Sequence, residues 1–237
     1  MTIPCIVLAG GQGSRLQKTL PNLPKCLAPI GNRPFLQWQL YSLAERGIDH
    51  FVLALGHNSK IVETALKEPW AKSLRIDIVV ETKPLGTGGA VNFAMRSKDL
   101  DEALVVNGDT IVCGSLDVMF VPLDLNALEF LRLAIVEVDN QSRFGGVEID
   151  SENNVTKFVE KGLPNSGFIN AGFYRIHKKA FAMETDINFS LEKSTLSKLA
   201  SFKGLQARKL KGPFIDIGVP DDYYFLSNNY RLFVDNE

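Results

Sequence analysis

The sequence contains few cysteines, which argues against a disulfide-rich domain and against a zinc-binding domain. Only Cys5, Cys26 and Cys113 occur, an odd number with no close spacing between them. A disulfide framework or a zinc site needs thiols grouped at short intervals. The pattern therefore favours reduced thiols in a cytoplasmic protein, since disulfides are rare in that compartment.

Long apolar runs and blocks of like charge are also missing. No apolar stretch approaches the roughly 18 residues of a membrane span. The apolar run near the N-terminus is short and follows no cationic segment, so it is typical of a first strand rather than of a signal peptide. The formal net charge is −1, without a basic or acidic tail. We therefore expect neither nucleic acid nor a membrane as a partner.

The first half alternates strand-like and helix-like segments, within an ordinary globular composition of 45% apolar and 22% charged residues. Short apolar runs predict strands at 3–9, 51–55, 75–80 and 103–107. Helical spacing predicts helices over 34–46, 59–67 and 88–95. This order indicates a parallel sheet covered on both faces, a doubly wound three-layer α/β/α fold. Ligands bind such folds beyond the carboxyl ends of the strands.

The second half has closely spaced strand candidates at 131–138, 145–149, 155–159 and 168–176. They predict an antiparallel or mixed addition to the sheet. Helices near 189–200 and from about 221 follow. No repeat, low-complexity segment or linker marks a boundary, so we expect a single domain over 1–237.

The glycine-rich loop Gly10–Arg15 follows the first predicted strand. Glycines at 10, 11 and 13 let backbone N–H groups approach an anion, and phosphate is the natural guest. Arg15 can donate two hydrogen bonds to a pyrophosphate, and Lys25 can add a point charge. The alternative is only a tight strand-to-helix turn.

Two better-known phosphate motifs do not fit this loop. The dinucleotide fingerprint, counted from Gly11, places Leu16 where its third glycine belongs. The P-loop pattern, counted from Gly10, meets Arg15 instead of glycine. A nicotinamide dehydrogenase is therefore disfavoured.

Two carboxylates are candidate metal ligands. Asp109, in Asn107-Gly108-Asp109, ends a predicted buried strand, although an aspartate there is often only a turn former. Asp216 stands in an apolar stretch, where a carboxylate is costly unless it is paired or binds a cation. Two carboxylates with triphosphate oxygens and water would complete an octahedral magnesium site.

The spacing G-G-x-G-S-R-L, followed by L-P-K, resembles the sugar-1-phosphate nucleotidyltransferase family; Cys26 replaces the usual second proline. The resemblance implies a Rossmann-like, glycosyltransferase-A-like mixed sheet, catalytic roles for Arg15, Lys25 and Asp109, and Mg²⁺ on Asp109 and Asp216. It implies nucleotide binding by Leu8, Ala9, Gly10, Gly11, Gly13, Ser14, Glu81, Pro84, Gly86, Thr87, Asn107 and Gly108. Roughly residues 1–130 would form a nucleotide-binding half and 131–237 a sugar-phosphate-binding half.

The acceptor side also matches the family. The resemblance implies that Glu160 binds sugar hydroxyls and Lys161 the sugar phosphate, whereas the alternative is a surface ion pair. Gly145 and Asn170 match positions that line the sugar pocket; for the glycine, a bulge or close strand packing is the alternative. No Ser-His-Asp or Cys-His set is apparent, and attack by an anionic phosphate requires none.

Glu81 lies in the segment that the family uses to read the base. Guanine presents two donors that one carboxylate can accept, so Glu81 favours GTP; the alternative is a solvated Glu81, with the backbone reading the base. The motifs LPKCLAPIGNRPFL, ETKPLGTGGA, LVVNGDT and FIDIGVPDDY resemble the D-glycero-D-manno-heptose 1-phosphate guanylyltransferase branch. The implied reaction joins GTP and that sugar phosphate, giving GDP-heptose and pyrophosphate.

Three alternatives stay open: mannose or glucose 1-phosphate as acceptor, another nucleotide, or a non-catalytic regulatory subunit that binds nucleotide sugars. Retention of Arg15, Lys25, Asp109 and Asp216 together disfavours the regulatory subunit. The sequence does not determine the oligomeric state and is compatible with a homo-oligomer.

Overall fold

The computed structural model describes residues 3–11, 16, 19–159 and 165–231. The chain divides into two compact units. Unit 1 comprises residues 1–84, 106–113 and 213–237, and unit 2 comprises 85–105 and 114–212. None of these boundaries falls near residue 130, where the sequence suggests a division into halves. The expectation of one domain over 1–237 stays a prediction.

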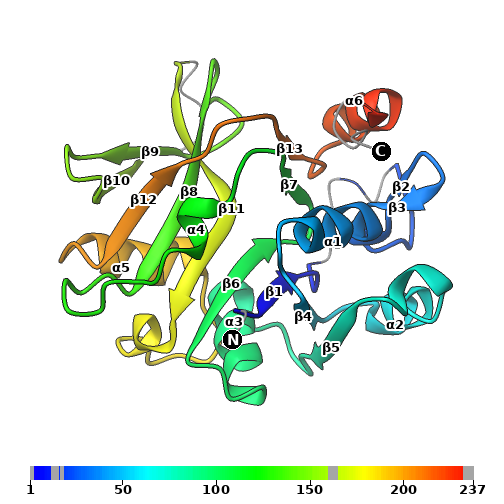
Figure 1. Cartoon of the computed structure of the whole chain (residues 1–237), viewed down its shortest axis with the longest axis horizontal. Helices are drawn as coiled ribbons and strands as arrows, with labels where there is room; N and C mark the ends of the chain where they lie inside the picture. Colours follow the sequence, from blue (N-terminus) through cyan, green and yellow to red (C-terminus); the bar gives the residue numbers. More distant parts are fainter. Residues whose placement is uncertain (1–2, 12–15, 17–18, 160–164, 232–237) are drawn as a thin grey trace. The chain divides into compact units, whose positions relative to one another are not determined.

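Unit 1 contains the predicted parallel strands. β1 (Cys5–Leu8), β4 (His50–Leu55) and β5 (Arg75–Val80) lie side by side in the order β1-β4-β5, all parallel (Figure 1). Their register aligns Cys5 with Phe51 and His50 with Arg75. β1 and β4 are almost wholly buried, as their continuous apolar sequences predict.

The other elements of unit 1 include several that pack around an apolar cluster. They are the 3₁₀ turns η2 (Lys25–Leu27) and η3 (Pro69–Ala71), the hairpin β2 (Pro29–Ile30) and β3 (Arg33–Pro34), the helices α1 (Phe35–Glu45), α2 (Ser59–Ala65) and α6 (Pro220–Asn229), and the antiparallel pair β7 (Thr110–Val112) and β13 (Phe214–Asp216). Phe35, Ile111, Ile217 and Leu226 pack together there. The cluster joins α1, β7 and α6, segments far apart in the sequence.

Unit 2 has the mixed sheet that the second half predicts. β8 (Leu131–Val138) pairs antiparallel with β11 (Gly167–His177) and parallel with β12 (Leu205–Lys209). β9 (Gly146–Ile149) pairs antiparallel with β10 (Val155–Val159) and with β11. The helices are α3 (Gly86–Ser97), α4 (Asp117–Phe120), the 3₁₀ turn η4 (Lys178–Phe181), the π-helical turn η5 (Leu191–Leu196) and α5 (Ser197–Ala200). β6 (Glu102–Asn107) begins in unit 2 and ends in unit 1.

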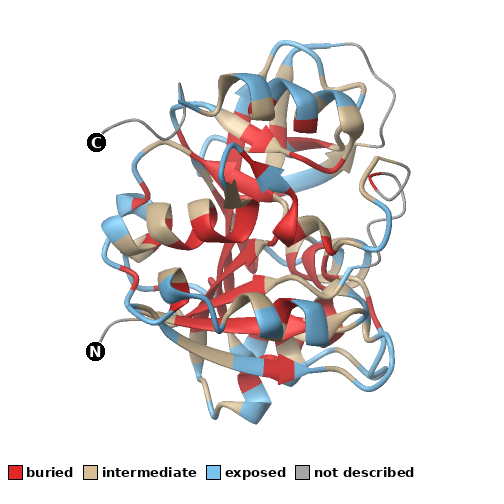
Figure 2. Ribbon diagram, turned by 90° about the vertical axis from the view of Figure 1, so that its right-hand side faces the viewer, coloured by how far each residue is buried: buried red, intermediate tan, exposed pale blue. Residues whose placement is uncertain are grey.

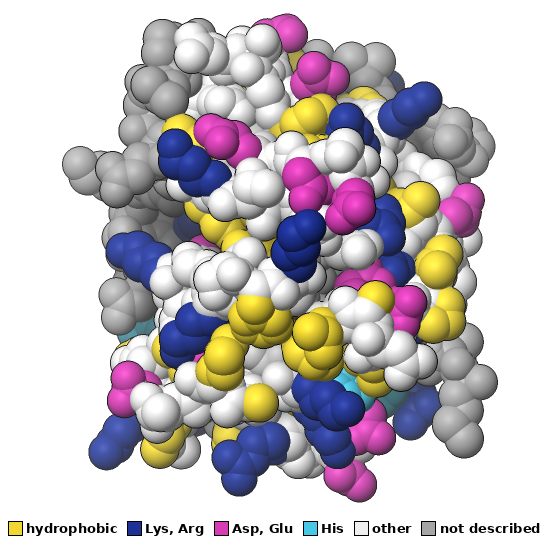
Figure 3. Space-filling view, turned by 90° about the vertical axis from the view of Figure 1, so that its left-hand side faces the viewer, with side chains coloured by type: hydrophobic (Ala, Val, Ile, Leu, Met, Phe, Trp, Pro, Cys, Tyr) yellow, Lys and Arg dark blue, Asp and Glu magenta, His cyan; other side chains and the backbone are white. Residues whose placement is uncertain are grey.

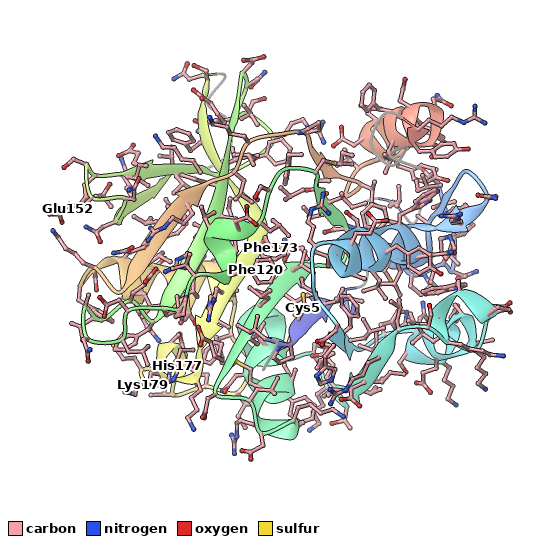
Figure 4. The ribbon with its side chains drawn as sticks, in the orientation of Figure 1. Cys5, Phe120, Glu152, Phe173, His177 and Lys179 are labelled. Carbon is pink, nitrogen blue, oxygen red and sulfur yellow. The ribbon has the colours of Figure 1, made fainter. Side chains whose placement is uncertain are left out.

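Buried residues follow the strands of each unit, and the helices show exposed faces (Figure 2). Basic and acidic side chains are interspersed on the face drawn in Figure 3. Within the part of the chain that the structure describes, no helix is long and apolar enough to cross a bilayer. All three cysteines are thiols outside any disulfide, and burial raises the pKa of each, including Cys5 on β1 (Figure 4).

Candidate functional site

The carboxyl ends of β1, β4 and β5 bring Gly10, Gly56 and Glu81 together in unit 1. The Glu81 N–H donates to Leu55 O at 2.9 Å, which ties the end of β5 to that of β4. A Cβ on Gly10 would lie 3.0 Å from Gly56 N and 3.3 Å from Glu81 Oε1. A Cβ on Gly56 would lie only 2.5 Å from Glu81 Oε1. The first loop and the Glu81 carboxylate therefore pack closely because both positions are glycine.

The turn after β6 lies against the end of β1. The Gly108 N–H donates to Leu8 O at 2.9 Å. A Cβ on Gly108 would stand 2.6 Å from that same oxygen and 3.2 Å from Ala9 Cα. The predicted residues that adjoin at the carboxyl ends of the strands are therefore Leu8, Ala9, Gly10, Glu81, Asn107 and Gly108. Gly11 is exposed, and among the described residues beyond its chain neighbours none comes within 4 Å of its virtual Cβ. Pro84 is exposed at the end of the same segment.

Lys25 and Asp109 form an ion pair at this edge. Lys25 is in η2, and its Nζ lies 3.1 Å from Asp109 Oδ2. The side chains are 17% and 26% exposed, respectively, so the pair is shielded but reachable from solvent. The Asp109 carboxylate therefore lies at the end of a buried strand, with the Lys25 ammonium beside it.

Asp216 is brought to Asp109 by the β7–β13 pair. Asp216 lies opposite Thr110 in the register, and the Ile217 N–H donates to Asp109 O at 2.9 Å. Burial and then the Asp109 charge raise the pKa of Asp216, whereas the hydrogen bond from Gly218 N opposes that shift. The two carboxylates therefore repel one another in a partly desolvated place.

This carboxylate pair fits a magnesium ion. A bound cation would offset both the desolvation of Asp216 and its repulsion from Asp109. Over residues 3–11, 16, 19–159 and 165–231, no cluster of three or more His, Cys, Asp or Glu side chains could hold a metal. Mg²⁺ is commonly held by one or two carboxylates, with phosphate and water completing its octahedron. Magnesium binding by Asp109 and Asp216 stays a prediction.

Gly86 and Thr87 begin α3 in unit 2, where they contact the segment around η5. The Thr87 hydroxyl donates to Glu192 Oε2 at 2.8 Å and accepts from Leu191 N at 2.9 Å. A Cβ on Gly86 would lie 2.4 Å from Phe189 O. These contacts anchor the start of α3; nucleotide binding by Gly86 and Thr87 stays a prediction.

Gly145 and Asn170 lie near each other in unit 2, because Ile169 of β11 is opposite Gly146 of β9. Asn170 Nδ2 donates to the Tyr174 hydroxyl at 2.8 Å, and its Oδ1 accepts from Gly172 N. Both positions remain predicted sugar-binding residues. Five predicted residues lie outside those that the structure describes: Gly13, Ser14, Arg15, Glu160 and Lys161.

Sequence reasoning missed Gly56 and Glu192. Gly56 directly follows a strongly apolar strand, a signal that ordinary turns share. Glu192 belongs to an amphipathic segment and carries no motif; its contact with Thr87 spans 105 residues of sequence. Only tertiary structure reveals either role.

Known proteins match this chain over nearly its whole length. A family model described as nucleotidyl transferase matches residues 5–231. A D-glycero-alpha-D-manno-heptose 1-phosphate guanylyltransferase from Aneurinibacillus thermoaerophilus is 36% identical, covering 92% of this chain and 94% of the relative. One of the same name from Campylobacter jejuni is 35% identical, covering 94% and 99%. The crystal structure of HddC from Yersinia pseudotuberculosis complexed with GMP-PN is 32% identical, with a TM-score of 0.83 and coverage of 97% and 100%.

Proposed function

Because the chain belongs to the nucleotidyl transferase family, we propose that it transfers GMP from GTP to D-glycero-α-D-manno-heptose 1-phosphate. An oxygen of the sugar phosphate attacks the α-phosphorus of GTP, the bond to the β-phosphate oxygen breaks, and pyrophosphate leaves with GDP-heptose as product. The two relatives carry this activity in their names, and the HddC structure holds a guanine nucleotide.

The arrangement of Lys25, Asp109 and Asp216 is the observation that carries this proposal. Both reactants are anions, so approach of one phosphate to the other requires positive charge at the reacting centre. The Lys25 ammonium, held by Asp109, supplies part of it. Asp109 and Asp216 would hold Mg²⁺, which would supply further positive charge against the developing negative charge of the phosphates. No protein nucleophile is needed, because the acceptor is already anionic and catalysis depends on positioning.

The proposal assigns the remaining predicted residues by unit. In unit 1, Leu8–Gly11, Glu81, Asn107 and Gly108 would bind the nucleotide; close contacts among several of them support this assignment. In unit 2, Gly145 and Asn170 would bind the sugar phosphate, with Glu160 and Lys161.

A pyrophosphate-release panel tests the activity. GTP, UTP, dTTP and CTP are each combined with heptose, mannose and glucose 1-phosphates in the presence of Mg²⁺. We expect the highest kcat/KM for GTP with D-glycero-α-D-manno-heptose 1-phosphate. A higher value for mannose 1-phosphate would replace the proposed sugar, and release without a sugar phosphate would contradict the proposed transfer.

Exchange of Glu81 for Gln should weaken guanine selection. The carboxylate can accept from both N1–H and the exocyclic amine, whereas the amide replaces one acceptor with a donor. Loss of a hydrogen bond to a charged group costs about 1.5–3 kcal/mol, so kcat/KM for GTP should fall roughly 10- to 100-fold. Steady-state kinetics with GTP and UTP check this, with the exposed Glu68→Gln as control. An unchanged GTP/UTP ratio would remove Glu81 from base reading.

Gly56→Ala should displace the Glu81 carboxylate, because the new methyl group would lie 2.5 Å from Glu81 Oε1. A displacement of about 1 Å can cost up to roughly 100-fold in rate, and we expect KM for GTP to rise about tenfold. The double variant Gly56→Ala/Glu81→Ala provides the comparison. If Gly56 acts through Glu81, adding Gly56→Ala to Glu81→Ala costs little more. Additive losses would assign Gly56 an independent role.

A further inference from the structure

Gln39 of α1 binds the turn that carries Asp109 on both sides. Its side chain is almost completely buried, with the residue only 1% exposed. Its Nε2 donates to Asn107 O at 2.8 Å and to Thr110 O at 2.6 Å. These two carbonyls bracket Gly108 and Asp109, so a single amide group clamps the ends of the turn.

The clamp completes a three-sided attachment of the turn. Gly108 N bonds to β1 through Leu8 O, and Asp109 O accepts from Ile217 N beyond β13. Gln39 adds the attachment to α1. The direction of the Asp109 side chain depends on the backbone of its own turn, and the Lys25 ion pair alone tethers only the carboxylate.

An amide is a costly choice at this position of α1. Its helical neighbours Phe35, Leu36, Leu40 and Leu43 are all buried and apolar. Among the residues that the structure describes, Gln39 Oε1 meets no hydrogen-bond donor, and a buried unsatisfied polar atom costs about 1–3 kcal/mol. A methionine would fill similar space without that cost. Both hydrogen bonds of Gln39 Nε2 go to the Asp109 turn, so the amide stabilises that turn.

We infer that Gln39 is a positioning residue that holds Asp109 in the orientation a divalent cation requires. The inference rests on the proposed function for the metal role of Asp109. Side chains that orient metal ligands typically contribute 10- to 100-fold in metal affinity or activity. Gln39 acts here through the backbone of the turn, not by contact with the ion.

Gln39→Met tests the inference, with Gln37→Met on the same helix as the matched control. Mn²⁺ binding in the presence of GTP is measured by electron paramagnetic resonance. We expect the Mn²⁺ Kd of Gln39→Met to rise about 10- to 100-fold, and that of Gln37→Met to stay unchanged. In the metal-free protein, hydrogen exchange should accelerate in residues 107–110, while exchange in β4 and β8 stays slow. In turnover assays, kcat should fall at low Mg²⁺ and partly recover at high Mg²⁺, with KM for the sugar phosphate unchanged.

Wild-type Mn²⁺ affinity and unchanged exchange at 107–110 in Gln39→Met would overturn the inference, as would exchange that accelerates equally throughout unit 1. If Gln39→Met does not fold, Gln39→Asn takes its place; it keeps a buried amide with a shorter reach and should show a smaller change of the same sign. Failure of the proposed function is distinguishable. Wild-type protein that binds Mn²⁺ with GTP but releases no pyrophosphate contradicts the activity, whereas the Mn²⁺ and exchange measurements still decide the role of Gln39.

Discussion

Asp109→Asn is expected to lower kcat about a thousandfold while the protein keeps its fold. The amide has nearly the same shape but carries no charge, so it binds a hard cation poorly and no longer holds Lys25 by an ion pair. Stabilisation of charge by a bound metal contributes several kcal/mol, and about 4 kcal/mol corresponds to that loss of rate. Pyrophosphate release at saturating GTP and Mg²⁺ measures it.

Asp221→Asn is the matched control, because Asp221 is an exposed acid in the first turn of α6. Its rate should equal that of the wild type. A second readout follows from the electrostatics of the site. The Asp109 charge raises the pKa of Asp216, so Asp109→Asn should lower that pKa in the metal-free protein, as carboxyl NMR titration would show. A wild-type rate in Asp109→Asn would remove Asp109 from the reaction.

Arg132→Met is expected to lower the free energy of unfolding by about 3–5 kcal/mol, because the buried Glu129 carboxylate loses its bidentate partner. It then keeps the Arg208 guanidinium, at 3.8 Å, and the hydrogen bond from Asp124 N. Arg132 and Glu129 are each only 2% exposed. Arg132 Nε and Nη2 reach the two Glu129 oxygens at 2.7 and 2.8 Å, which is a bidentate pair. The guanidinium also donates to carbonyls of Val118, Val121 and Pro122, so it fixes the segment that ends α4.

Chemical denaturation followed by circular dichroism measures this loss. Arg75→Met, at an exposed site on β5, should change the free energy of unfolding by less than about 0.5 kcal/mol. Adding Glu129→Leu to Arg132→Met should restore part of the stability, because the buried charge that lost its bidentate partner is then gone. If the double variant is less stable than Arg132→Met by the full cost of Glu129→Leu alone, the buried pair is not the cause.

Local sequence pattern was sufficient to predict most elements. The predicted strands at 131–138 and 155–159 are confirmed to the residue as β8 and β10, and the predicted helix over 34–46 is confirmed as α1. Apolar periodicity reports which face of a segment is buried, and that information is local. Elements of three residues give no period, and so β7 and β13 were not predicted.

Those short strands matter for the site. Their pairing brings Asp216 to Asp109 across 107 residues of sequence, which the motifs predicted only through resemblance. The boundaries of the two units could not be predicted from the sequence either. The boundary after Pro84 lies inside the motif ETKPLGTGGA, where the composition does not change. The π-helical turn at Leu191–Leu196 lies within the helix predicted near 189–200. Its π-helical form was not predicted. Leu191 N in this turn donates to the hydroxyl of Thr87, which is distant in sequence.

The interleaving of the two units has a consequence for biosynthesis. The chain passes between the units at residues 84–85, 105–106, 113–114 and 212–213, so unit 1 receives its last segment only after all of unit 2 has been translated. Asp216 and α6 belong to that last segment. A ribosome-bound chain that has already made the glycine loop, Lys25 and Asp109 therefore still lacks the second carboxylate. The pair of carboxylates proposed to bind the metal is complete only after Asp216 has been translated, and neither unit can be separated from the other by a single cut in the gene.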